Sequence, residues 1–229
     1  MSDAVPELSP AQAALLALLV EREALCFGDF VLKSGRRSPY FINLGRLCQG
    51  GDLAVLGRAY AETLRAAYGD GIDAIFGPAY KGIPLALAAA AAYQELVGRP
   101  VGWAFDRKEA KAHGDGGWLV GQPLSAGQRV AIVDDVLTAG TALREALAKL
   151  RPLAVRVVGA VVAIDREEPG SAGRPAREEL MAQEGLPVAA IVGIRAACAW
   201  LAARPRGGRC ALAAEDAARI LAHLAAQQA

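Results

Sequence analysis

From residue 74 onward, short apolar runs alternate with alanine-rich stretches that are long enough to form helices. The apolar runs predict strands at residues 74–76, 101–105, 129–133, 155–164 and 187–194. The other stretches predict helices at about 81–96, 140–150, 195–203 and 214–226. Alternating strands and helices indicate βαβ units, so the sequence predicts an α/β fold with a mostly parallel central sheet flanked by helices. Ligands of such sheets bind at the carboxyl ends of the strands.

The first 50 residues follow a different pattern. Ser9, Pro10 and Gln12 have the order of an N-cap, a first-turn proline and a capping-box glutamine, which predicts a helix from there to about Cys26. Residues 30–32 and 40–42 predict two short strands around a turn, which would form a small N-terminal hood. A helix is expected from Asp52 to about residue 68. We divide the chain into a helix and hood, residues 1–50, and an α/β core with C-terminal helices, residues 51–229, within a single structural unit.

Charge and hydropathy exclude several classes of protein. The 229 residues carry a net charge of +1, so they show no electrostatic footprint for duplex nucleic acid. The longest strongly apolar stretch, residues 83–93, has 11 residues, whereas a membrane span needs about 20. The first ten residues contain no lysine or arginine, unlike a secretion signal. We therefore expect a cytoplasmic protein with no nucleic-acid or membrane partner.

The cysteines suit neither a zinc site nor a disulfide scaffold, because they are few and widely spaced. We expect all four to be buried or free thiols: Cys26, Cys48, Cys198 and Cys210.

Residues 130–142 carry the most informative pattern. Four apolar residues, two aspartates and two apolar residues precede Thr-Ala-Gly-Thr-Ala and a helix. The turn offers N–H groups, hydroxyls and a helix N-terminus, which together bind an anion. Asp134 and Asp135 would repel that anion, so they suit sugar hydroxyls or a metal ion reached through water. The pattern predicts a ligand such as a ribose 5-phosphate; the alternative is a turn with solvated aspartates and a threonine that caps the helix.

Three further segments carry small or basic residues at expected strand ends or turns. Residues 77–84 combine small residues, which let a ligand approach the backbone, with Lys81 at a helix start. Tyr80 either contributes to ligand binding in that loop or is only a packed ring. Residues 105–117 contain three basic residues and His113, which predicts an exposed charged loop or a movable lid over a leaving anion. Residues 33–43 bring a lysine and aromatic residues into the hairpin, which suits a cover over a planar base.

Lysine is scarce in this chain, because only five of the 25 basic residues are lysines. Lys33, Lys81, Lys108 and Lys111 lie in the segments described above, and Lys149 lies outside them. A compact ammonium cannot be exchanged for a planar guanidinium at a phosphate site without changing its geometry. The four lysines therefore indicate phosphate handling.

Together these segments resemble the type I phosphoribosyltransferases, and the orotate phosphoribosyltransferase family most closely. Residues 130–142 are similar to the motif with which that fold binds phosphoribosyl pyrophosphate (PRPP). The resemblance extends from about Leu25 to Ile194 and includes Leu-Lys-Ser-Gly-Arg, Ser-Pro-Tyr-Phe, Gly-Pro-Ala-Tyr-Lys-Gly-Ile-Pro, Arg-Lys-Glu-Ala-Lys and His-Gly-Asp-Gly-Gly. It implies the type I phosphoribosyltransferase fold. It also implies transfer of ribose 5-phosphate from PRPP to N1 of orotate, giving orotidine 5′-monophosphate and pyrophosphate in pyrimidine biosynthesis.

The resemblance also implies roles for individual residues. PRPP would be bound by Lys33, Tyr80, Lys81, Arg107, Lys108, Lys111, His113, Asp134, Asp135, Val136, Leu137, Thr138, Ala139, Gly140, Thr141 and Ala142. Orotate would be bound by Lys33, Phe41, Ile42, Thr138 and Arg166, whose guanidinium suits the orotate carboxylate. Ile42 stands where many members have phenylalanine. The implied catalytic residues are Lys111 on the pyrophosphate, His113 assisting it, and Asp134 and Asp135 on the ribose hydroxyls.

Two further implications concern a cofactor and a partner. Mg²⁺ is implied as the cofactor, held mainly through PRPP and water and not directly by the protein. The implied partner is a second copy of the chain, in a homodimer whose lids reach the neighbouring sites.

Two alternative functions share this fold. The chain could transfer the phosphoribosyl group to another base, or it could be a non-catalytic PRPP-sensing regulator. Such regulators often carry a DNA-binding segment or lack lid residues, whereas this chain has a full set of lid residues and a net charge of only +1, which argues against a regulator. An unrelated nucleotide-binding protein would need a glycine-rich phosphate loop such as Gly-x-Gly-x-x-Gly, which the sequence lacks.

Overall fold

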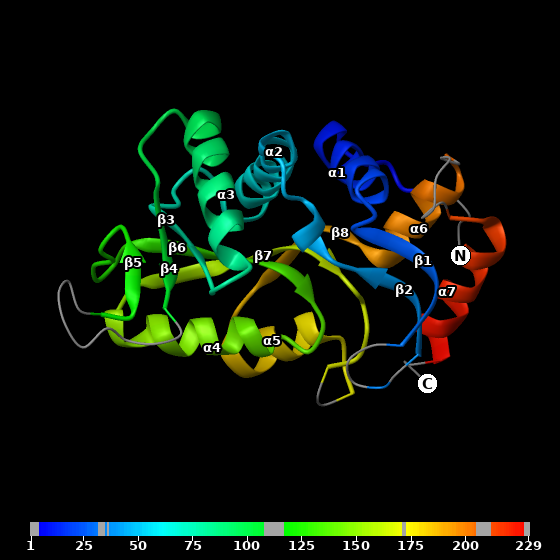
Figure 1. The fold of residues 1–229 in the computed structure, drawn as a ribbon. Helices are drawn as coiled ribbons and strands as arrows, with labels where there is room; N and C mark the ends of the chain where they lie inside the picture. Colours follow the sequence, from blue (N-terminus) through cyan, green and yellow to red (C-terminus); the bar gives the residue numbers. More distant parts are fainter. Residues whose placement is uncertain are drawn as a thin grey trace.

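The computed structural model describes residues 5–31, 35, 37–107, 117–170, 173–204 and 212–226. Its helices are α1 (Pro10–Glu21), α2 (Gly50–Tyr68), α3 (Gly82–Val97), α4 (Thr141–Leu150), α5 (Ala176–Glu184), α6 (Ile194–Ala202) and α7 (Ala214–Ala226) (Figure 1). Its strands are β1 (Leu25–Val31), β2 (Arg37–Ile42), β3 (Ala74–Gly77), β4 (Gly102–Asp106), β5 (Leu119–Gly121), β6 (Arg129–Leu137), β7 (Arg156–Asp165) and β8 (Val188–Gly193). Short 3-10 turns lie at Leu44–Arg46 and Arg151–Leu153.

The central sheet has six strands in the order β5-β4-β3-β6-β7-β8. Five of them are parallel, and the edge strand β5 runs antiparallel to β4. The predicted mostly parallel sheet is therefore confirmed. In β3, Ala74 pairs with Val130 of β6 on one side and with Gly102 of β4 on the other. The carboxyl ends of these strands consequently lie at one edge of the sheet, where a ligand is expected.

Helices cover both faces of the sheet. α1, α2 and α3 lie on one side, and α4 and α5 lie on the other (Figure 1). Successive residues of a strand therefore enter different cores: Ile75 packs in the cluster that contains residues of α2 and α3, whereas Phe76 packs in the cluster that contains residues of α4 and α5. Burial on both faces explains why these strands read as unbroken apolar runs.

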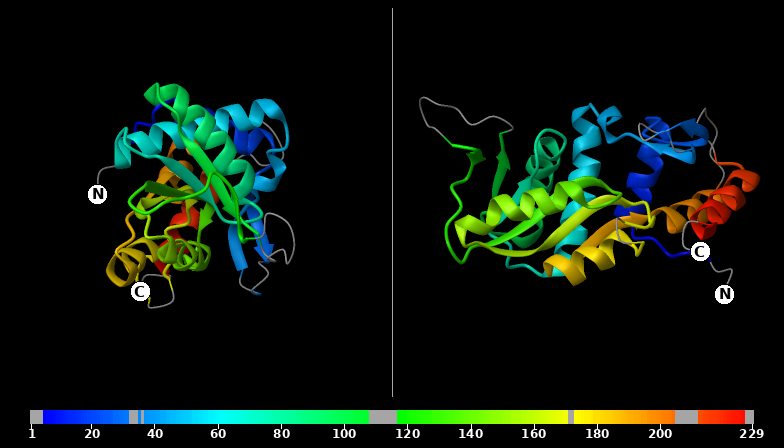
Figure 2. Two further views of the ribbon diagram at one scale, coloured as in Figure 1. Left: turned by 90° about the vertical axis from the view of Figure 1, so that its left-hand side faces the viewer. Right: turned by 90° about the horizontal axis from the view of Figure 1, so that it is seen from below.

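The hood consists of the antiparallel pair β1 and β2. Hood residues such as Leu25 and Tyr40 share one apolar cluster with residues of the main sheet, and α7 packs against α6 and β2. The hood and the β4–β5 end lie at opposite ends of the molecule (Figure 2). The division at residue 50 stays a prediction.

Several boundaries differ from the sequence prediction. α1 has the expected capping box of Ser9 and Gln12 but ends at Glu21. The last residues of the expected helix belong instead to β1, which begins at Leu25. β6 runs four residues past the expected end, because its ladder with β7 continues to Leu137. The sequence did not predict β5 or α5, whose residues show little apolar periodicity.

The expectation for the cysteines is wrong at one position. Cys48 and Cys198 are free thiols, but Cys26 is disulfide-bonded. The expectation of four thiols is wrong because spacing along the chain does not show which cysteines the fold brings together. Burial raises the pKa of the Cys198 thiol to about 12. Among the described residues, no helix is long and apolar enough to cross a membrane.

A close approach between α2 and α3 yields a stability prediction. A Cβ atom at Gly57 of α2 would lie 2.5 Å from the carbonyl oxygen of Ala88 in α3. Gly57→Ala should therefore lower the free energy of unfolding by about 1–3 kcal/mol, although alanine favours a helix by about 1 kcal/mol. Urea denaturation measures the change.

Gly51 provides the matched control, because it lies in the same helix and a Cβ there would meet nothing within 4 Å. Gly51→Ala should leave stability unchanged or raise it slightly. Equal losses in the two variants would contradict the close helix contact.

Candidate active site

Asp134 and Asp135 are two consecutive buried carboxylates near the end of β6, each 8% exposed. The β6–β7 ladder continues beyond them, with Asp134 opposite Val162. Because side chains alternate along a strand, the two carboxylates leave β6 on opposite sides. The alternative of solvated aspartates at a strand-end turn is therefore wrong.

Local donors hold this carboxylate pair in place. The Asp135 N–H donates to Asp134 Oδ1 and the Val136 N–H donates to Asp135 Oδ1, both at 2.9 Å. Lys81 Nζ donates to the other oxygen of Asp135 at 2.6 Å. From α2, the Tyr60 hydroxyl donates to the Asp134 carbonyl oxygen at 2.6 Å and fixes the main chain.

These contacts do not fully offset the burial of the pair. Burial, and then the neighbouring charge of Asp135, raise the pKa of Asp134 to about 6. The N–H of Asp135 and the charge of Lys81 act in the opposite direction. The ionised Asp134 carboxylate is thus short of donors, and the hydroxyls of a sugar would supply them.

The loop after β6 leads into the start of α4. Gly140 has a φ of 75°, and a Cβ there would lie 2.8 Å from a methyl of Leu180, so the position requires glycine. No described side chain caps α4, whose N-cap residue is Gly140, which excludes the alternative that a threonine does so. Arg144 Nη1 instead holds the Ala139 carbonyl at 2.7 Å. Within the described part of the chain, the first N–H groups of α4 have no side-chain acceptor, which leaves them available to an anion.

The predicted PRPP segment, residues 134–142, can therefore offer side-chain groups to a ligand at some positions and only backbone groups at others. Thr138, Thr141 and Ala142 are exposed, whereas the Leu137 side chain lies in the core beside α4 and can offer only backbone groups.

Residues 78–81 form the loop between β3 and α3, which we call the pyrophosphate loop. A cis peptide bond joins Ala79 to Tyr80. The Ala79 N–H donates to Asp106 Oδ1 at 2.6 Å, and Lys81 reaches Asp135. Tyr80 is 67% exposed, so the alternative of a packed ring is wrong. The loop is tied to the ends of β4 and β6 while Tyr80 faces outward.

The predicted lid is described only at its base. The Arg107 N–H donates to the Trp118 carbonyl at 2.6 Å and closes the stem. Arg107 Nη1 is buried and has no hydrogen-bond partner among the described residues, so an anion here would find an unused donor. Lys108, Lys111 and His113, like Lys33 of the hood, lie outside the described residues.

In the hood, Phe41 and Ile42 lie at the end of β2. Phe41 is 38% exposed, and its ring stacks on Phe30 with centroids 5.6 Å apart. Arg166, directly after the end of β7, is 5% exposed and lies over the Tyr40 ring at 4.5 Å. β2 and the end of β7 are thus in direct contact.

An internal carboxylate already binds part of the Arg166 guanidinium. Arg166 Nε and Nη2 donate to Glu168 Oε1 at 3.0 and 2.6 Å, and the Tyr40 hydroxyl donates to the same oxygen at 2.7 Å. Nη2 also contacts Ser38 Oγ at 3.4 Å, whereas Nη1 makes no hydrogen bond to a described residue. An incoming carboxylate would therefore meet the edge that carries Nη1.

Sequence reasoning missed the residues that hold these groups in position: Ser38, Tyr40, Tyr60, Asp106, Glu168 and Lys149. Asp106 and Glu168 are neighbours of the predicted Arg107 and Arg166, which is a usable signal. Tyr60 lies in an alanine-rich helix and carries no such signal.

Comparisons with known proteins agree with this geometry. The family model described as phosphoribosyl transferase domain matches residues 47–174. The fold is thus that of a type I phosphoribosyltransferase.

Comparisons with individual proteins identify a narrower family. Orotate phosphoribosyltransferase of Thioalkalivibrio sulfidiphilus is 50% identical over 80% of this chain and 84% of its own. The enzyme of the same name from Xanthomonas euvesicatoria is 52% identical over 78% of this chain and 81% of its own. The crystal structure of the Francisella tularensis orotate phosphoribosyltransferase is 32% identical and has a TM-score of 0.75, with 91% of this chain and 96% of that chain covered. The chain belongs to the orotate phosphoribosyltransferase family.

The raised pKa of Asp134 predicts a pH-dependent stability difference. Folding favours the protonated carboxyl, so its contribution is complete below the unfolded pKa of 3.8 and is lost as the pH rises through about 6. Asp134→Asn, which cannot ionise, should gain stability relative to the wild type between about pH 4 and pH 7, on the order of 2–3 kcal/mol. Denaturant unfolding at both pH values measures the gain.

Asp29→Asn is the control, because Asp29 is an exposed aspartate of the hood. It should show no comparable gain. A difference between the wild type and Asp134→Asn that stays constant with pH would contradict the raised pKa.

Proposed function

We propose that this chain transfers the ribose 5-phosphate of PRPP to N1 of orotate and releases pyrophosphate, as a step of pyrimidine biosynthesis. One observation carries the proposal: two buried carboxylates near the end of β6 are followed by a short loop and a helix start that no described side chain caps, and Lys81 joins Asp135 to the pyrophosphate loop. This arrangement suits a ligand with a diol between a phosphate and a diphosphate. We propose the cytoplasm as its location.

The reaction needs positioning and charge more than a nucleophilic side chain. The ribose 5-phosphate binds at the loop 138–142 and the start of α4, and Asp134 and Asp135 accept hydrogen bonds from the ribose hydroxyls. As the C1–O bond loosens, positive charge develops on the sugar, as in glycoside hydrolysis. The two carboxylates stabilise that charge while orotate N1 attacks from the opposite face.

Lys81 links the two halves of the site. It pairs with Asp135, yet its side chain is largely exposed. A bound diphosphate would attract the ammonium and free Asp135 for the ribose. Arg107 Nη1, Lys108, Lys111 and His113 bind the leaving pyrophosphate, with Lys111 as the main cation.

Orotate binds between the hood and the end of β7. Its carboxylate takes the Nη1 edge of Arg166, and Phe41 and Ile42 contact the ring, with Lys33 and Thr138 nearby. Because Arg166 is buried and its Nη1 makes no hydrogen bond to a described residue, this site favours an anionic base over adenine or uracil.

Mg²⁺ is the proposed cofactor. Among the described residues, no cluster of three or more His, Cys, Asp or Glu side chains could hold a metal ion. Asp134 and Asp135 provide oxygen ligands, but Lys81 occupies one carboxylate. This donor set fits Mg²⁺ held by PRPP and reached by the carboxylates through water. Bound there, Mg²⁺ would neutralise charge on the leaving pyrophosphate.

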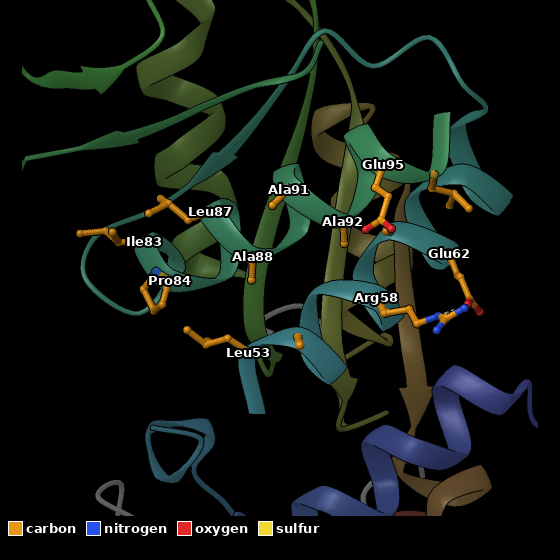
Figure 3. A pocket seen from close by; sticks show the side chains of 13 residues that line it. Leu53, Arg58, Glu62, Ile83, Pro84, Leu87, Ala88, Ala91, Ala92 and Glu95 are labelled. Carbon is orange, nitrogen blue, oxygen red and sulfur yellow. Dashed lines mark hydrogen bonds and ion pairs between the residues drawn. The ribbon is translucent and has the colours of Figure 1, made fainter. Parts of the chain in front are cut away.

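We also propose a homodimer formed through the face of α2 and α3. An apolar groove of about 970 Å³ lies between these helices, lined by Leu53, Ile83, Pro84, Leu87 and Ala88 (Figure 3). Its rim carries Arg58, Glu62 and Glu95, so the face bears both charges and can complement itself in a two-fold pair.

The groove adjoins the active site, since Ile83 and Pro84 follow directly after the pyrophosphate loop. A second copy seated there lies beside that loop. Within one chain, the lid stem at β4–β5 and the hood lie at opposite ends (Figure 2). This placement supports a lid that serves the neighbouring subunit.

Product analysis with a panel of bases tests the reaction. Orotate, PRPP and Mg²⁺ should give orotidine 5′-monophosphate and pyrophosphate, and uracil, adenine and hypoxanthine should react far more slowly. Removing the metal with a chelator should abolish turnover. Turnover with adenine but not orotate would favour the alternative of another base, and DNA binding without pyrophosphate release would favour a regulator.

Lys111→Ala should lower turnover strongly with little loss of folding stability, because it removes a cation from the lid. Steady-state kinetics and thermal unfolding measure the two effects. Near wild-type turnover in this variant would contradict the role of Lys111.

Mixed dimers test the shared lid. Subunits with Lys111→Ala and subunits with Asp135→Asn should each be nearly inactive, but mixing them should restore about a quarter of wild-type activity, because half of the dimers gain one intact site. Adding Leu87→Glu to both subunits should block dimerisation and remove the recovery. No recovery between stable dimers would contradict the shared site.

A further inference from the structure

Lys149 is the one lysine of the sequence that lies outside the predicted phosphate-handling segments. It lies in the last turn of α4, at the end away from the ribose-phosphate loop. In the structure its Nζ donates to Asp106 Oδ2. Lys149 therefore contacts the last residue of β4, and not Glu145, the one acidic residue of its own helix.

Asp106 joins three segments of the active site. It is 4% exposed, and while one carboxylate oxygen accepts from Lys149, the other accepts the Ala79 N–H of the pyrophosphate loop at 2.6 Å. The next residue, Arg107, closes the lid stem with Trp118. A single carboxylate thus links the pyrophosphate loop, the lid stem and α4.

Both lysines in the described part of the chain support this loop. Lys81 pairs with Asp135 from within the loop, and Lys149 pairs with the carboxylate that holds Ala79. The ion pairs away from the site, such as Arg65–Asp70 and Arg151–Glu184, use arginine. An ammonium suits Asp106, because its other oxygen is already engaged and a planar guanidinium prefers both oxygens.

Removing Lys149 would leave Asp106 buried without a cation, and a buried unpaired carboxylate is strongly unfavourable. The chain can relieve this cost by turning Asp106 toward water, which breaks the bond to Ala79. The orientation of the pyrophosphate loop consequently depends on a lysine that does not touch the substrate.

We propose that Asp106 and Lys149 are positioning residues for the pyrophosphate of PRPP. The pair fixes Ala79 and the lid stem in the geometry that receives the diphosphate. This inference rests on the proposed function.

The test compares single and double variants at this pair. Lys149→Met should raise KM for PRPP about tenfold, the lower end of the effect of losing a charge-assisted hydrogen bond, with KM for orotate unchanged. Asp106→Asn combined with Lys149→Met should recover most of this loss, because the amide oxygen still accepts from Ala79 and no unpaired charge remains. Lys149→Arg should retain part of the function.

Arg151→Met is the matched control. Arg151 follows α4 directly and pairs with the exposed side of α5 through Glu184, away from the loop. Its removal should leave both KM values unchanged. Wild-type turnover of orotate and PRPP is measured first, so failure of the proposed function is recognised independently of this pair.

Hydrogen exchange of the Ala79 amide is a second measurement, and a general loss of stability would not reproduce its expected pattern. The amide should exchange faster in Lys149→Met and in Asp106→Ala than in Arg151→Met, with slow exchange restored in the double variant. An unchanged KM for PRPP with unchanged Ala79 protection in Lys149→Met would overturn the proposal. So would equal increases in both KM values.

Discussion

The burial of two consecutive carboxylates at the end of β6 is the constraint on which the site depends. Asp134 and Asp135 lose water and face each other's charge, so each needs donors from its surroundings. The chain supplies two backbone N–H groups and Lys81, and Tyr60 fixes the main chain between them. The raised pKa of Asp134 shows that this supply is incomplete. A protein that keeps such a shortage gives up stability for binding, and ribose hydroxyls would complete the set.

The same principle applies at the other strand ends, where charged groups are held by partners within the protein. Arg166 lies between Glu168, Ser38 and the Tyr40 ring, and Asp106 lies between Ala79 and Lys149. In both places at least one partner comes from a different element, so the contact fixes that element as well as the charge. The hood is attached to the end of β7 in this way, and the pyrophosphate loop to the end of β4. Preorganisation of this kind is what a transfer reaction without a protein nucleophile requires.

Much of the fold and part of the site could be predicted from the sequence. The alternation of apolar runs with helical stretches predicted the parallel sheet, because that periodicity is local. The pattern around Asp134 and Asp135 placed an anion site beside two carboxylates, because strand, turn and helix start are adjacent in the chain. β5 and α5 were not predicted, since a three-residue edge strand and a short, mostly polar helix leave little periodic signal. The disulfide bond of Cys26 was not predictable either, because disulfide formation depends on the distance between two cysteines in space.

The sequence by itself determined which chemical groups the site contains: the acid pair, the threonine- and glycine-containing turn after it, and the scarce lysines. Only the tertiary structure decided which of them meet. Lys81 and Asp135 are 54 positions apart, Lys149 and Asp106 are 43 apart, and Tyr60 and Asp134 are 74 apart. No local pattern encodes such pairs, because they form only when parallel strands bring their carboxyl ends to one edge and helices pack behind them. The groups are specified by residue type, and their partners by the packing of the sheet.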